Sequence, residues 1–110
     1  MIEERMRKIE KRIEQAPGLP ETERGKLLQL VATLREEVAA LARSHEEDAQ
    51  SIAHFLDAST HEISRTKKQA KLIEAARHGL TASVEGFERT HPKLFETVSQ
   101  AAVVLANMGL

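Results

Sequence analysis

The five histidines are the most conspicuous chemical groups in this sequence. His54, Asp57 and His61 share one helical face, at i, i+3 and i+7, and imidazole and carboxylate groups are metal ligands. The two histidines would lie roughly 10.5 Å apart along a helix axis, which is a poor spacing for one ion about 2 Å from each ligand. We therefore assign no metal site. A solvated polar face is the simpler interpretation, and a metal held by Asp57, His61 and ligands from another chain is the alternative.

Two further histidines stand at helical spacing from carboxylates. Glu88 and His91 match the Glu-x-x-His pair of di-iron helical proteins, but such a site needs a second pair and two more glutamates on facing helices. His91 precedes a proline, which removes it from regular helix, so a capping or turn role fits better. His45 and Asp48 are either a buried polar pair that fixes the register of a helix seam or two solvated side chains where that seam opens; we favour the second interpretation.

The residues Arg65, Lys67, Lys68, Lys71 and Arg77 form a locally basic stretch. Such a stretch can contact phosphate, but the first four residues are spread around much of a helix, so a solvated basic face is the better interpretation. The sequence has no glycine-rich phosphate loop, and spacing supports no convergent Ser, His and Asp group. We therefore expect no enzyme activity, no catalytic residues and no cofactor.

The composition excludes several classes of protein. The sequence has 16 Lys and Arg and 17 Asp and Glu, so its net charge is -1. Binding to bulk nucleic acid or to an anionic membrane needs an excess of basic residues. There is no Cys, Trp or Tyr, which excludes disulfides and thiol catalysis and argues against base stacking. The charged N-terminus is unlike a signal peptide, and no apolar run reaches the ~20 residues of a membrane span. We expect one soluble, cytoplasmic domain over residues 1–110 that binds no membrane.

Heptad spacing of apolar residues predicts the helices. Steps of four, three and four predict a helix over residues 2–15, which Pro17 and Pro20 end. The cleanest pattern predicts a second helix over 21–57. Unbroken, that helix would be roughly 55 Å long, and the polar seam at 44–48 is where it would break.

The remaining sequence predicts two more helices, over 60–89 and 92–107. The third would begin at a Ser-x-x-Glu capping box that starts at Ser59, and the fourth has Pro92 at its first position. Gly79 marks either the close approach of a neighbouring backbone or a cap that splits the third helix. We therefore predict an all-α fold of about four helices, in antiparallel hairpins that form an elongated bundle or coiled coil.

The apolar stripe of each predicted helix must be covered, within the chain or by another chain. The first helix can cover only about half of the second, and a protomer of 110 residues with narrow stripes would have a thin core. We therefore expect self-association, most simply as a twofold homodimer, with a monomeric four-helix bundle as the alternative. The expected interface residues are Leu27, Val31, Leu34, Val38, Leu41, Ile52 and Phe55.

The C-terminal third carries two motifs, FERTHPKL at 87–94 and LANMGL at 105–110. They resemble the patterns Phe-Glu-x-x-His-Pro-x-Leu and Leu-x-Asn-(Leu/Met)-Gly-(Ile/Leu) of a family of small bacterial helical proteins, catalogued as domain of unknown function 4404. The N-terminal helical hairpin also looks similar, whereas residues 44–65 match only some members. The resemblance implies a bacterial origin and an all-helical protein, and it brings no activity with it.

The sequence thus predicts a non-enzymatic helical protein that associates with itself and presents helix faces to an unidentified protein partner. A metal-binding helical protein that uses the histidine and carboxylate groups above is one alternative. A weak nucleic-acid accessory protein that uses the basic stretch is another.

Overall fold

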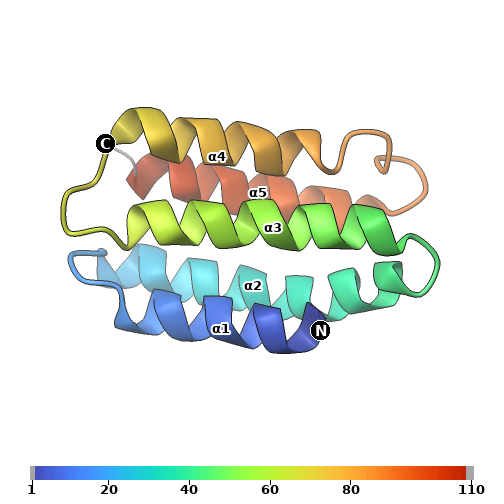
Figure 1. Ribbon diagram of the computed structural model, residues 1–110, viewed down its shortest axis with the longest axis horizontal. Helices are drawn as coiled ribbons and strands as arrows, with labels where there is room; N and C mark the ends of the chain where they lie inside the picture. Colours follow the sequence, from blue (N-terminus) through green and yellow to red (C-terminus); the bar gives the residue numbers. More distant parts are fainter. Residues whose placement is uncertain (1, 109–110) are drawn as a thin grey trace.

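A computed structural model describes residues 2–108 as five α-helices joined by turns, without a strand in that range (Figure 1). The helices are α1 (Ile2–Gln15), α2 (Glu21–Ala42), α3 (Glu46–Ile63), α4 (Ala70–Ala82) and α5 (Pro92–Met108). All five lie along the long axis, and consecutive helices run in opposite directions. The predicted all-α class is confirmed, but this part of the chain holds five helices where about four were predicted. None of these helices is both long and apolar enough to span a bilayer.

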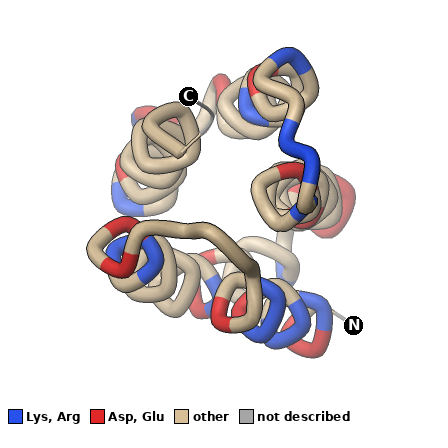
Figure 2. The backbone as a smooth tube through the Cα atoms, turned by 90° about the vertical axis from the view of Figure 1, so that its left-hand side faces the viewer, with Lys and Arg blue, Asp and Glu red and all other residues tan. Residues whose placement is uncertain are grey.

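The helices α2 to α5 pack around a shared interior, and Figure 2 looks along it from one end. α2 contacts α3 and α5, α4 contacts α3 and α5, and α1 lies over the pair formed by α2 and α3. The radius of gyration is 12.8 Å, close to the ~13 Å expected of a compact domain of this length. The longest dimension is 38 Å, which is shorter than the roughly 55 Å that an unbroken helix over 21–57 would span.

The predicted helix over 21–57 is two helices, because the chain turns back at residues 43–45. α2 ends at Ala42, where the backbone N–H groups of Ser44 and His45 both donate to the carbonyl of Leu41. α3 then begins with three acidic residues in its first turn, at positions 46–48, which suit the positive end of the helix dipole. The polar seam therefore breaks the helix where the sequence indicated.

The turn between α1 and α2 is closed by Arg24, a residue that the heptad pattern did not single out. Its guanidinium donates to the carbonyls of Ile13 at 2.6 Å and Glu14 at 3.0 Å, and to that of Leu19 at 3.5 Å. The last carbonyls of a helix have no partner within it, and a cation beside them favours the dipole. Arg24 thus caps α1 and holds it to α2.

The capping box predicted at Ser59 is wrong, since Ser59 and Thr60 lie inside α3 and are buried. Their hydroxyls donate back to carbonyls of the same helix, Ser59 to Phe55 at 2.8 Å and Thr60 to Asp57 at 3.0 Å. Buried hydroxyls satisfied in this way continue a helix instead of starting one. The helix predicted over 60–89 is therefore only the thirteen-residue α4.

Gly79 lies within α4, and the ring of Phe55 from α3 sits against it. A methyl group on Gly79 would overlap atoms of that ring. The space beside Gly79 is thus filled by an aromatic side chain, and not by the neighbouring backbone that was predicted to approach it. The cap that would split a helix here is wrong.

The residues expected at an oligomer interface lie mainly in the chain's own core. Leu27, Val31, Leu34, Val38, Leu41 and Ile52 are buried within the single chain, and Phe55 is half-buried against Gly79. The expectation was wrong because α3 folds back on α2, and α1 and α5 then cover the faces that a longer rod would leave open. A second copy of the chain is not needed to cover the stripe of α2.

Candidate binding groove between α1 and α3

Ion pairs join α1 to α3 along part of their length. The carboxylate of Asp57 on α3 accepts a hydrogen bond from Arg12 at 2.5 Å and lies 3.7 Å from Arg5. Arg12 also donates to the backbone carbonyl of Asp57 at 3.2 Å. One carboxylate thus faces two guanidinium groups, so this contact has a local charge of +1.

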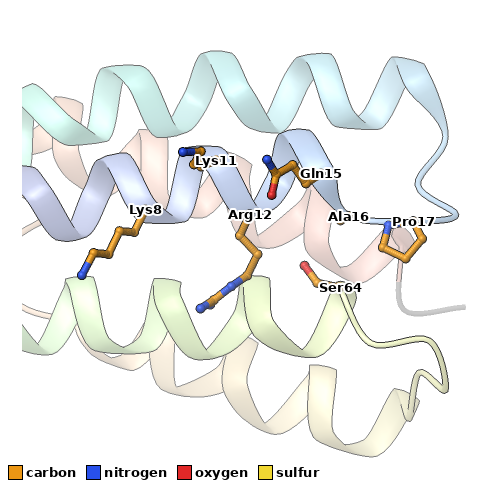
Figure 3. A pocket seen from close by; sticks show the side chains of 7 residues that line it. All are labelled: Lys8, Lys11, Arg12, Gln15, Ala16, Pro17 and Ser64. Atoms are coloured by element: carbon orange, nitrogen blue, oxygen red, sulfur yellow. The ribbon is translucent and has the colours of Figure 1, made fainter.

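A groove opens at the C-terminal end of this contact (Figure 3). It has a volume of about 360 Å³ and is lined by Lys8, Lys11, Arg12, Gln15, Ala16, Pro17 and Ser64. Figure 3 shows Lys8 and Arg12 extending from α1 toward α3. Ser64 lies at the end of α3, and Pro17 lies in the turn after α1. Three of the seven lining residues are cations and none is a carboxylate.

The loop from α3 to α4 adds cations beside the groove. Lys68 Nζ donates to the carbonyl of Pro17 at 3.4 Å, which ties this loop to the turn between α1 and α2. Figure 2 faces this end of the molecule and shows Lys and Arg positions both along the loop and on α1. The basic stretch predicted from the sequence therefore continues the charge of the groove.

The cations around the groove divide into paired and unpaired ones. Arg12 is held by Asp57, and Arg65 lies 3.0 Å from Glu62. Among the described residues no ion pair forms to Lys8, Lys11 or Lys67, and all three are exposed. The available positive charge is therefore carried by lysines.

A second hollow of about 400 Å³ lies beside the first and shares Lys8 with it. Its other lining residues are Glu4, Arg5, Gln50 and Asp57. This hollow combines two carboxylates with two cations, so it has no net preference for an anion. The single sign of charge distinguishes the first groove.

The residues weighed as metal ligands, His54, Asp57 and His61, make other contacts in the structure. Asp57 is engaged by the arginines of α1, and His54 Nδ1 lies 3.5 Å from the guanidinium of Arg5. His61 points to solvent, with 62% of its side chain exposed, and comes no nearer than 4.0 Å to Glu62. Within residues 2–108, no three His, Cys, Asp or Glu side chains converge as metal ligands. The structure does not bring this face together around a common point.

The other two histidine sites lie at the opposite end, where the turn after α2 meets the loop before α5. The rings of His45, Phe87 and His91 form an edge-to-face cluster, with centroids 5.1 to 5.7 Å apart. Glu88 accepts a hydrogen bond from the backbone of Gly86 at 2.7 Å, so it does not pair with His91. His45 and Asp48 are both exposed, as the favoured interpretation of that seam expects.

The groove itself was not predicted. A signal was nevertheless present, because Arg5, Lys8 and Arg12 stand at i, i+3 and i+7 beside the apolar stripe of α1. Three cations on one flank of a stripe define a basic edge. That edge becomes a groove only because α3 folds back alongside it, and the sequence did not predict this neighbour.

A family model described as "Domain of unknown function (DUF4404)" matches residues 27–110. The matched range contains most of α2 and all of α3 and α4, together with α5 and both C-terminal motifs. The residues of α1 that line the groove come before the matched range. Neither the curated proteins nor the solved structures contain a match to this chain.

Proposed function

The chain belongs to the DUF4404 family, and we propose that it is a non-enzymatic helical protein that binds a partner macromolecule in the groove between α1 and α3. The observation that carries this proposal is the lining of the groove, with three cations, no carboxylate and a volume of about 360 Å³. Side chains of one sign in a concave surface raise the local concentration of an oppositely charged partner. The proposal includes the bacterial origin and cytoplasmic location that the sequence predicts.

The closed interior supports a binding function on the exterior. The apolar stripes pack against each other inside the chain, so most of the helix surface left for a partner is polar. The groove holds no pair of side chains arranged as nucleophile and base, because Ser64 Oγ donates to the Thr60 carbonyl at 2.6 Å and no histidine lines it. Binding is therefore the simplest use of this surface.

Site-specific photocrosslinking tests the proposal. A photoreactive side chain at Gln15, which lines the groove, should form adducts with a defined partner in extracts of the native cell. The same group at Thr90, exposed in the turn before α5, is the control and should not form those adducts. The adducts at position 15 should fall when Lys8 and Lys11 are changed to Gln. Equal labelling from both positions, or none from position 15, contradicts the proposal.

Self-association is a second candidate function, on a different surface. Val103 on α5 is 61% exposed, and α5 carries no charged residue after Glu96. Two copies can bring such a face together without like-charge repulsion. Sedimentation equilibrium should then show a dimer that Val103→Glu converts to monomer, whereas a monomer at every concentration removes this candidate.

A further inference from the structure

We propose that the groove between α1 and α3 takes an acidic polypeptide segment in extended conformation, and this inference rests on the proposed function. The unpaired cations around the groove are lysines, since Arg12 and Arg65 are held by Asp57 and Glu62. The fork of arginine matches carboxylate and phosphate alike, and lysine presents a point charge that pairs with either group. The cations of the groove therefore favour an anionic occupant, and its other lining residues decide between a peptide and a nucleic acid.

The spacing of the cations suits side chains that alternate along a strand. Lys8 and Lys11 are three residues apart on α1, so their Cβ atoms are about 5–6 Å apart. Residues on one face of an extended peptide repeat about every 6.6 Å, a difference that flexible lysines can accommodate. Lys68, held at the turn by the Pro17 carbonyl, lies where such a segment would leave the groove.

The remaining lining residues suit a polypeptide backbone. Gln15 is exposed and carries both a donor and an acceptor, so its amide can pair with a peptide group. Pro17, which is exposed, adds apolar surface for side-chain stems. A peptide can use all three kinds of contact at once.

A nucleic acid fits this surface less well. No aromatic side chain lines the groove, and bases bind single-strand sites largely by stacking on such rings. The whole chain has a net charge of -1, and acidic turns such as residues 46–48 repel a long polyanion. A short acidic segment, confined to the groove, avoids that repulsion.

Fluorescence anisotropy with purified full-length protein tests this inference. The probe is a short labelled peptide in which Glu alternates with Ala, and the competitors are single-stranded RNA, phosphatidylserine vesicles and inorganic phosphate. We expect saturable binding of the peptide that weakens as salt is raised. The variant Lys8→Gln/Lys11→Gln should lower the affinity about fivefold, because two exposed ion pairs of about 0.5 kcal/mol each sum to about 1 kcal/mol.

The matched control is Arg43→Gln/Arg89→Gln, which removes the same charge from exposed positions outside the groove and should change the affinity less than about twofold. Equal losses in both variants, tighter binding of RNA, vesicles or phosphate, or no binding of the peptide would each overturn the inference. Groove-specific crosslinks at Gln15 together with no peptide binding would overturn only the ligand class. Failure of both experiments would remove the proposed function as well.

Discussion

The two sides of α3 are built on different principles. Toward α4, the ring of Phe55 fills the space that Gly79 leaves free, so the contact depends on shape. Toward α1, apolar side chains of both helices belong to the shared core, but along the partly exposed edge Asp57 faces Arg5 and Arg12, so this edge depends on charge. The same helix therefore has a close-packed side toward α4 and a polar edge toward α1.

This difference separates stability from recognition. Close-packed apolar surfaces contribute most of the free energy of folding, and they leave no room for a ligand. Ion pairs whose members are about one-third exposed, as at Asp57 and Arg12, contribute little to stability, and their charges stay accessible. The polar edge of α3 can thus bind a partner without weakening the packed side.

The largest effect on the free energy of unfolding is expected from Leu34→Ala, because Leu34 of α2 lies in the hydrophobic core. Leu34 is fully buried, so its truncation should lower the free energy of unfolding by about 3 kcal/mol. Urea denaturation measures the loss, which should not depend on protein concentration, because the contacts are within one chain. Leu72→Ala, at a partly exposed position on α4, is the control and should cost much less. A loss of stability for Leu34→Ala that grows on dilution would show that Leu34 makes contacts between chains, as was expected from the sequence.

The next variant, Gly79→Ala, tests the shape-based contact directly. The added methyl group overlaps the Phe55 ring, so the free energy of unfolding should fall by about 1–2 kcal/mol despite the better helix propensity of Ala. In a Phe55→Leu background the same change should cost nothing or stabilise. The control is Gly25→Ala in α2, where nothing lies within 4 Å of the new atom, so up to about 1 kcal/mol of stabilisation is expected. Equal effects at the two glycines would contradict the packing.

The sequence predicted those features that depend on periodicity. Both terminal helices, over 2–15 and 92–107, agree with α1 and α5 to within one residue at each end, because apolar stripes and proline positions are local signals. The break near residues 44–48 was also visible as a polar seam. Family membership followed from the C-terminal motifs, which lie in the matched range.

Contacts between distant residues could not be predicted in the same way. Ser59 has a capping pattern, but its burial against the rest of the chain makes it continue α3. The pairing of Asp57 with Arg12 joins residues 45 positions apart, and no periodicity encodes that. The groove and the enclosure of the α2 stripe both depend on such pairings, which is why the stripe was assigned to an interface.

A third variant, Arg24→Gln, tests how much the contacts at the C-terminal end of α1 stabilise its packing on the rest of the chain. Arg24 donates to three carbonyls at the turn after α1, but only the 2.6 Å bond to Ile13 is both short and part-buried, and one hydrogen bond from a charged donor contributes about 1.5–3 kcal/mol. The side chain is only 16% exposed, so we expect a loss of about 1–2 kcal/mol and faster amide exchange in α1. Arg77→Gln, which removes only a 3.9 Å pair with Glu74, should cost less than about 0.5 kcal/mol. A reversed order would show that the cap does not hold α1.

The smallest effect on stability is expected from Asp57→Asn. This variant also tests most directly whether the two sides of α3 differ in function. The coupling between Asp57 and Arg12 in a double-mutant cycle with Arg12→Gln should be about 0.5–1 kcal/mol and should shrink as salt is raised, because both side chains are partly exposed. The same change removes the carboxylate that opposes Arg12, so the groove gains one uncompensated positive charge. Affinity for the acidic peptide should therefore rise about twofold or more while stability falls slightly. Stability and affinity that fall together would mean that Asp57 supports the groove by holding Arg12 in place, and the polar edge of α3 would then be structural in the same sense as the packed side.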